Sequence, residues 1–241
     1  MYGLLLAGGR STRTKPLFPQ KNAVEVLWEG EVKTVIRHQI DMLLPLVEKL
    51  YVAVWHHKEL YGKLEGVHVL EYEPRGIADV WRRFLKDVPD ADAFISVNCD
   101  DLHRMEDYIR LASKTVPGVS VLFTRNREQI DSCTAYEVDK SLTIKKVIGK
   151  NSGLPEAWIG TGVYILNRAV LEGVEWRVNE RTGEYEPDDV LRQLLSRGVA
   201  LKAYPVSTFA HIGELPVLLS LHEAAKKAKG CWRNEHWADV A

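Results

Sequence analysis

The residues best suited to chemistry lie in a short basic loop near the start of the chain. The loop holds two glycines followed by hydroxyl and basic side chains: Gly8, Gly9, Arg10, Ser11, Thr12, Arg13, Lys15 and Lys21. Paired glycines after a strand let a ligand approach the backbone closely, and successive amides there form an anion-binding concavity. Arginine and lysine add charges suited to phosphate oxygens. The pattern favours a phosphate-binding loop, with an ordinary solvated turn as the alternative.

A second candidate is the adjacent pair of carboxylates at Asp100 and Asp101. The pair follows an apolar run at 93–97 that is typical of a buried strand. A carboxylate at a strand end can hold Mg²⁺ while phosphate oxygens complete the coordination shell. Aspartate is also common in turns and at helix N-caps, so the spacing alone leaves a structural role open.

The string LAGGRSTR at 6–13, followed by Lys21, resembles the opening signature of sugar-phosphate nucleotidyltransferases, LAGGxGTR…PK. It is neither a Walker A loop nor a GxGxxG motif. Ser11 stands where this family prefers glycine, although its hydroxyl could still contact phosphate. The string is also similar to the corresponding segment of the enzyme that attaches GMP to molybdopterin, although the lysine of that segment usually lies closer to the arginine. The resemblance implies that Arg13 steadies pyrophosphate, that Lys21 stabilises the α-phosphate, and that the nucleotide contacts Leu6, Ala7, Gly8, Gly9, Arg10, Ser11 and Thr12.

Two further segments resemble the metal-binding motifs of this family. VNCDD at 97–101 is similar to its hydrophobic-x-x-G-D segment, which implies a metal ligand at Asp100. FAHIGE at 209–214 is similar to W-x-D-(I/T)-G-T, whose aspartate is the second ligand, but His211 stands there. The resemblance implies Mg²⁺, while imidazole makes Mn²⁺ or Co²⁺ alternatives. Other roles open to His211 are a phosphate contact, a weakened metal site, and a helix cap or surface residue.

Three weaker similarities concern the base and the acceptor. Gly76 begins a segment similar to the GTA motif that closes over the base, although on its own the segment favours a plain turn before a helix. Residues 148–150 occupy the place of the EKP motif, so Lys150 would contact the acceptor phosphate, whereas Gly149 cannot supply the glutamate that contacts the sugar. Gly162 lies in a segment similar to the (T/N)-(G/A)-x-Y strand beneath the sugar, which a plain strand with small residues also explains.

Composition sets the broader limits. The chain has 241 residues, a net charge of −1, and 46% hydrophobic residues, which permits a sizeable core and argues against a general polyanion-binding surface. Three widely spaced cysteines indicate neither a disulfide framework nor a zinc site. There is no signal-peptide pattern and no apolar run long enough for a membrane span. We therefore expect a cytoplasmic protein with no membrane or nucleic-acid partner.

The C-terminal segment 226–237 mixes basic and aromatic residues. This mixture could mark a nucleic-acid patch. With the net charge near zero, we instead favour packing of Trp232 and Trp237 against the body of the protein or a second subunit, which leaves a homo-oligomer open.

Alternating strands and helices over the first half predict a parallel, right-handed βαβ arrangement. Strands are expected at 4–7, 50–55, 67–70, 93–97 and 119–124, and helices at 32–46, 77–88 and 104–115. The second half predicts a hairpin at 133–147, strands at 158–166 and 200–204, and helices at 187–197 and 214–227. Ligands bind at the carboxyl ends of parallel strands, where the glycine loop and Asp100 would both lie.

We therefore predict a three-layer α/β/α fold with a mixed, mostly parallel sheet, as in the Rossmann-like nucleotidyltransferases. One domain would span 1–241, with a nucleotide-binding half at 1–130, an acceptor-binding half at 131–225 and a tail at 226–241. The expected function is a nucleotidyltransferase that joins a nucleoside triphosphate to a sugar 1-phosphate or similar phosphorylated acceptor and releases pyrophosphate. The alternative is a catalytically impaired relative that binds nucleotide or sugar nucleotide as a sensor or partner subunit.

Overall fold

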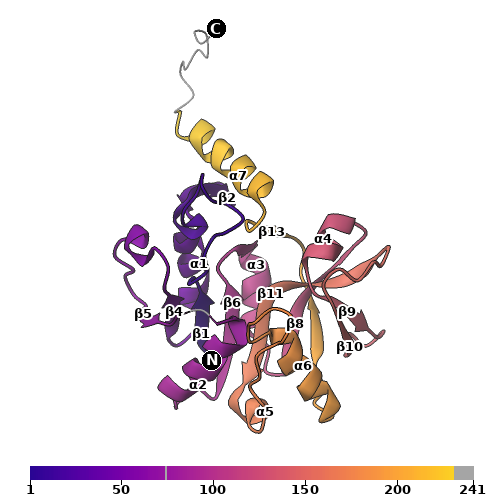
Figure 1. The fold of residues 1–241 in the computed structure, drawn as a ribbon. Helices are drawn as coiled ribbons and strands as arrows, with labels where there is room; N and C mark the ends of the chain where they lie inside the picture. The colour runs from indigo at the N-terminus through magenta and orange to yellow at the C-terminus, as the bar shows by residue number, and fades with distance from the viewer. Residues whose placement is uncertain (74, 231–241) are drawn as a thin grey trace.

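The first strand carries apolar side chains on both of its faces, which explains why the central sheet has a hydrophobic core on each side. In β1 (Tyr2–Leu6), Leu4 packs into one hydrophobic cluster and Leu5 into another, and both side chains are fully buried. Successive side chains of a strand point to opposite faces, so a strand that is apolar at both positions needs cover on both sides. The computed structural model describes residues 1–73 and 75–230, and its ribbon shows the resulting layers (Figure 1).

Nine strands form the central sheet of the described chain. Its order is β10-β9-β11-β6-β1-β4-β5, with β8 beside β11 and β12 beside β8. The pairings place β10 and β11 antiparallel to all the others, so the sheet is mixed and mostly parallel as predicted. Beyond β1, its strands are β4 (Leu50–Val54), β5 (His68–Glu71), β6 (Ala93–Asn98), β8 (Gly118–Thr124), β9 (Ala135–Val138), β10 (Ile144–Gly149), β11 (Ala157–Asn167) and β12 (Lys202–Pro205).

Helices cover both faces of the sheet, which confirms the predicted three-layer architecture (Figure 1). On one face lie α2 (Ile77–Asp87), α5 (Arg168–Leu171) and α6 (Pro187–Ser196), packed around the buried Trp81. The other face carries α1 (Val35–Leu43) and α3 (Met105–Ala112), while α7 (Leu215–Ala228) packs against β2 (Glu25–Trp28). A short α4 (Arg127–Ser132) packs on a third, smaller cluster near β11.

The predicted helix at 32–46 is wrong over its first residues. Residues 31–34 form β3 (Glu31–Thr34), which pairs with β2 (Glu25–Trp28) in an antiparallel hairpin. Glu29 and Gly30 both have positive φ, the geometry of the tight turn that fits a twisted hairpin. The helix begins only after Thr34, whose side chain accepts from the Arg37 amide as an N-cap.

One small pairing has particular importance for the site. Strand β7 (Asp101–His103) pairs antiparallel with β13 (Phe209–His211), and this pairing places Asp101 opposite His211. Neither three-residue strand was predicted. Their pairing connects the end of β6 to the segment that precedes α7.

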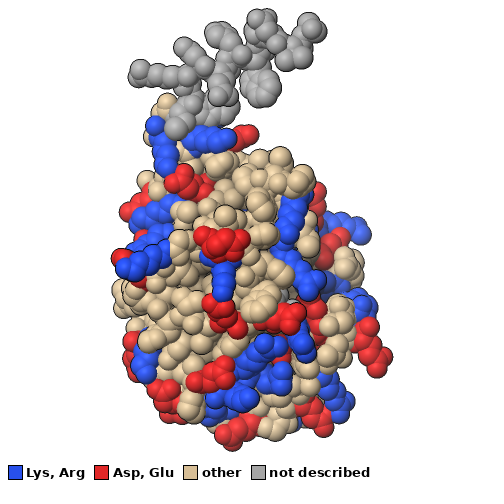
Figure 2. All heavy atoms as spheres, turned by 60° about the vertical axis from the view of Figure 1, so that its left-hand side comes forward, with Lys and Arg blue, Asp and Glu red and all other residues tan. Residues whose placement is uncertain are grey.

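The surface shows no single dominant charge over the face in Figure 2, where basic and acidic side chains are interspersed. Among the described residues, no helix is both long and apolar enough to cross a membrane. The predictions for Trp232 and Trp237 fall at 231–241, outside the described residues.

Candidate active site

Buried polar contacts within the glycine loop fix its shape as it leaves β1. Ser11 has a φ of 53°, a region that glycine accepts readily and most side chains avoid. Its hydroxyl donates to Gln20 Oε1 at 3.1 Å and accepts from the Lys21 amide at 3.2 Å. The Ser11 hydroxyl is therefore engaged within the loop, and its bonds hold the ends of the loop together.

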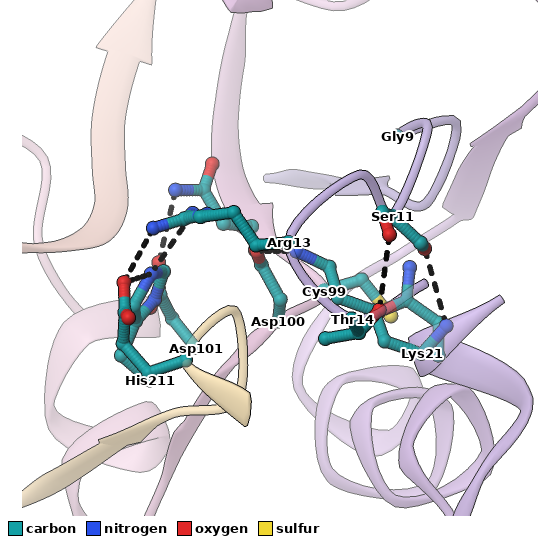
Figure 3. A network of polar contacts seen from close by, with 12 residues as sticks. Gly9, Ser11, Arg13, Thr14, Lys21, Cys99, Asp100, Asp101 and His211 are labelled. Atoms are coloured by element: carbon teal, nitrogen blue, oxygen red, sulfur yellow. Dashed lines mark hydrogen bonds and ion pairs between the residues drawn. The ribbon is translucent and has the colours of Figure 1, made fainter. Parts of the chain in front are cut away.

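Lys21 and Asp100 form a mostly buried ion pair at the base of this loop (Figure 3). Their side chains are only 11% and 19% exposed. Burial acts to raise the pKa of Asp100, but the charges of Lys21 and His211 outweigh it and hold that pKa well below its usual value. Asp100 is thus an ionised carboxylate at neutral pH, as a metal ligand must be.

A second pair joins Asp101 to His211. The imidazole Nδ1 lies 2.6 Å from Asp101 Oδ1, and the Ile212 amide donates to the Asp100 carbonyl at 2.9 Å. Burial alone would lower the pKa of His211, but Asp101 outweighs it and raises that pKa above its ordinary value. The Nδ1 proton is held by the carboxylate, so Nε2 is the ring nitrogen left to face the site.

Asn98 and Gly162 hold the Asp101 carboxylate in place. Asn98 Nδ2 donates to Asp101 Oδ2 at 2.9 Å. Gly162 has a φ of +80°, and a Cβ built there would lie 2.0 Å from the same oxygen. Glycine is therefore needed at 162 to make room for Asp101. This packing role accounts for the small residue that the sequence associated with acceptor binding.

Arg13 points from the loop toward the Asp101–His211 pair (Figure 3). Its guanidinium forms an ion pair with Glu214, and its Nη2 lies 3.4 Å from His211 Nε2. Just over half of the side chain is exposed. Arg13 can therefore exchange its protein partner for an anionic ligand at small cost, because exposed ion pairs contribute little stability.

Two neighbouring cavities bring these groups together. The larger has a volume of about 510 Å³, and its lining joins the glycine loop to side chains from distant segments: Gly8, Gly9, Arg10, Thr12, Arg13, Gly76, Asp100, Lys150 and His211. The smaller has a volume of about 110 Å³ and extends past Asp101 and Gly162 to the start of α6. Lys150, Arg13 and His211 line both cavities, so they lie at the boundary between them.

Gly76 lines the larger cavity, and its backbone packs closely against Tyr185, which precedes the lining residues of the smaller cavity. It precedes α2 with a φ of +101°, and a Cβ there would lie 2.4 Å from the Tyr185 carbonyl oxygen. The Tyr185 amide donates to the Arg75 carbonyl at 2.8 Å, and its own carbonyl accepts from the Ala78 amide at 3.1 Å. Only glycine permits this close approach. The loop before α2 is thereby held against the segment that leads into α6.

The residues present suit a cation only in part. In the described chain, no group of three or more His, Cys, Asp and Glu side chains is arranged to hold a metal. Asp100 offers a carboxylate oxygen and His211 offers Nε2, and the Oδ1 atom of Asn98 is buried without a hydrogen-bond partner. Two protein donors fit a cation whose other ligands come from substrate phosphates.

Several residues named from the sequence lie together in the structure. Leu6, Thr12, Lys150 and His211 line the larger cavity, and Ala7 is buried. Residues that the sequence did not single out are Asn98 and three that line the smaller cavity, Thr134, Glu186 and Asp188; nor did it predict that Asp101 pairs with His211. The position of Asp101 next to Asp100 was the available signal.

The sequence profile of the MobA-like NTP transferase domain matches residues 3–153 of this chain. None of the curated proteins compared with the chain matches it.

Several solved structures share the fold over nearly the whole chain. A protein assigned as a glucose-1-phosphate thymidylyltransferase from Bacillus anthracis, in complex with sucrose, has 18% identity and a TM-score of 0.72, with 94% of this chain and 96% of that one covered. HddC from Yersinia pseudotuberculosis, complexed with GMP-PN, has 18% identity and a TM-score of 0.66, covering 92% and 98%. The inositol-1-phosphate CTP transferase from T. maritima has 16% identity and a TM-score of 0.70, covering 95% and 96%. At such identities the likeness shows the fold alone.

Proposed function

Because this chain belongs to the family of MobA-like NTP transferase domains, we propose that it is an enzyme joining a nucleoside triphosphate to a sugar 1-phosphate or similar phosphorylated acceptor. An acceptor phosphate oxygen attacks the α-phosphorus and forms a new P–O bond. The bond from that phosphorus to the oxygen bridging toward the β-phosphorus breaks, and its electron pair leaves with pyrophosphate. The observation that carries the proposal is the larger cavity, which joins the glycine loop, Asp100, His211 and Lys150.

The nucleotide binds, in this proposal, along the glycine-loop side of the larger cavity. Backbone amides near Gly8 and Gly9, with Arg10 and Thr12, hold the triphosphate oxygens. Gly76 lies on the opposite wall, where its close packing on Tyr185 shapes the base region. Ser11 contributes through the loop geometry that its buried hydroxyl maintains.

Lys21 and Arg13 carry the charge stabilisation. Lys21 is fixed against Asp100, which lines the cavity, so its ammonium is preorganised near the position of the α-phosphate. Arg13 lies at the boundary of the two cavities, where it can move from Glu214 to the departing pyrophosphate. Cationic side chains that are already in position need little rearrangement when negative charge develops on the phosphate oxygens in the transition state.

Asp100 and His211 Nε2 are the groups that would hold a divalent cation, Mg²⁺ by the family resemblance or Mn²⁺ or Co²⁺ because of the imidazole. When bound, such an ion neutralises phosphate charge and orients the triphosphate. Lys150, which lines both cavities, orients the acceptor phosphate. Gly162 supports this side of the site indirectly, by making room for Asp101.

The geometry disfavours a catalytically impaired relative. That alternative was motivated by the absence of a carboxylate at position 211, of glutamate at 149 and of glycine at 11. At position 211 the structure supports a compensating arrangement, because Asp101 lies 2.6 Å from His211 Nδ1 and leaves Nε2 as the ring nitrogen that can face a ligand.

A pyrophosphate-release screen tests the proposal. ATP, GTP, CTP, UTP and dTTP are each combined with a panel of sugar 1-phosphates, in Mg²⁺, Mn²⁺ and Co²⁺. Release with a defined pair identifies both substrates. Absence of release with a nucleotide-induced rise in Tm would favour the binding-only alternative, and absence of both would refute the two functions together.

With the substrate pair in hand, Lys21→Ala is expected to lower kcat by about 10²- to 10⁴-fold, the range for loss of a preorganised charge at a reacting group. Lys15→Ala is the matched control, since Lys15 is an exposed lysine of the same loop, whereas Lys21 is buried against Asp100. Full turnover in Lys21→Ala would show that the assignment of Lys21 is wrong.

A further inference from the structure

Asp188 presents a largely buried carboxylate to the smaller cavity. It lies in the first turn of α6, and its side chain is 17% exposed. Thr134, Lys150 and Glu186 line the same cavity. Asp188 therefore lies beside Lys150, the residue proposed to orient the acceptor phosphate, but on a different element of the fold.

This carboxylate has hydrogen-bonding capacity that the protein does not use. Thr134 Oγ1 lies 3.0 and 3.1 Å from its two oxygens, but a hydroxyl has a single proton to donate. The nearest guanidinium nitrogen, Arg192 Nη2, is 4.0 Å away, beyond hydrogen-bond distance. An ionised carboxylate can accept about four hydrogen bonds. Within the described chain, Thr134 is the one side-chain hydrogen-bond donor to Asp188. The carboxylate lines the smaller cavity and also an adjoining one of about 370 Å³ that Gly149, Lys150 and Arg192 share.

The backbone at Gly149 explains why a carboxylate is needed from elsewhere. In the family that this chain resembles, a glutamate at this position contacts the sugar. Here Gly149 has a φ of +105°, which a glutamate would adopt only with strain. A Cβ built at Gly149 would lie 3.4 Å from Arg192 Nη2 and 4.0 Å from Asp188 Oδ2. The Asp188 carboxylate thus lies beside the position where the glutamate side chain would begin.

We propose that Asp188 supplies the acceptor recognition that Gly149 cannot, by accepting hydrogen bonds from hydroxyl groups of an acceptor whose phosphate lies toward Lys150. The inference rests on the proposed function and adds to it a residue that recognises the hydroxyl groups of the acceptor. The acceptor is a phosphorylated polyhydroxyl compound rather than a phosphorylated amine, because Arg192 and Lys150 already place two cations near Asp188. Burial is the main factor that raises the pKa of Asp188, which is the environment in which bound hydroxyls compensate a carboxylate best.

The test compares Asp188→Ala and Asp188→Asn with the control Asp189→Asn. Asp189 is the next residue of α6, pairs with Arg192 and Asn179, and lines neither cavity that we assign to substrates. With the substrate pair from the pyrophosphate screen, Asp188→Ala should raise the acceptor KM roughly 10- to 100-fold while the nucleotide KM changes less than about twofold. Asp188→Asn, which keeps one acceptor oxygen, should lie between wild type and alanine.

Deoxy analogues of the acceptor distinguish a direct contact with Asp188 from a purely structural role of this residue. Removing the hydroxyl that contacts Asp188 should lower kcat/KM in wild type but have little further effect in Asp188→Ala, because the two changes remove the same contact. Turnover by wild type with an unchanged acceptor KM in Asp188→Ala would overturn this inference alone. A phosphorylated amine as the preferred acceptor would overturn the substrate class. Absence of turnover by wild type with any pair would refute the proposed function, and this inference with it.

Discussion

Replacing Asp101 with asparagine should destabilise the protein in a manner that depends on pH. Asp101 raises the pKa of His211, so the folded state favours the protonated imidazole. A raised folded pKa contributes stability that is fully present below the unfolded pKa of about 6.5 and is lost as pH rises through the folded pKa. The stability difference between wild type and Asp101→Asn should therefore be largest in mild acid and shrink as the solution becomes alkaline.

The structure gives the approximate size of this effect. The 2.6 Å contact joins a ring that is 20% exposed to a carboxylate that is 6% exposed, so solvent screening is modest. A charge-assisted hydrogen bond of this kind contributes about 2 kcal/mol, which corresponds to a fall in Tm of about 4–8 °C for a chain of this size. Once the pH has risen through the raised pKa of His211 the imidazole is neutral, and we expect the loss to be about half as large there.

Thermal and urea denaturation of Asp101→Asn between pH 5.5 and 9 measures the effect. His211→Asn and the double variant complete a cycle that isolates the interaction between the two side chains. An equal loss of stability at every pH would refute the coupling to the imidazolium and would assign the effect of Asp101 to its bond with Asn98.

Two other substitutions in this region have expected outcomes. Gly162→Ala should lower the free energy of unfolding by about 3 kcal/mol, since its Cβ would lie 2.0 Å from Asp101 Oδ2 at a φ of +80°. The control Gly183→Ala has a φ of +72° and open space around it, so it should lower that free energy by only about 1 kcal/mol. Equal losses for the two variants in urea denaturation would contradict the packing role of Gly162. His211→Asp should lower Tm without metal, because it places a second carboxylate against Asp101, and Mg²⁺ should raise the Tm of this variant more than that of wild type. A metal-free variant as stable as wild type would contradict this reasoning.

The sequence predicted the sheet because its strands are short apolar runs whose burial on both faces is visible locally. Leu4 and Leu5 belong to opposite cores, and a run of that kind has few other solutions. The glycine loop was equally accessible, because its residues are neighbours in the sequence. The start of α1 was misjudged because Val32 fits a helical period as well as a strand, and only the turn at Glu29 and Gly30 distinguishes the two.

The details of the site depend on contacts between residues that are far apart in the chain. Asp101 and His211 meet through two three-residue strands, which are too short to produce a periodic pattern. Asp188 reaches the smaller cavity only because α6 begins beside the end of β10. The hydrogen bonds of the Ser11 hydroxyl with Gln20 and Lys21 likewise depend on the conformation of the whole loop.

The backbone contact between Gly76 and Tyr185 joins a residue that lines the larger cavity to the segment that leads into the smaller one. Tyr185 is hydrogen-bonded to residues 75 and 78 on one side and leads directly into residues 186–188 on the other. A shift of the loop before α2 upon contact with a base would therefore carry the carboxylates of Glu186 and Asp188 with it. The affinities for the two substrates would then be linked, and each substrate would change the affinity for the other by the same factor.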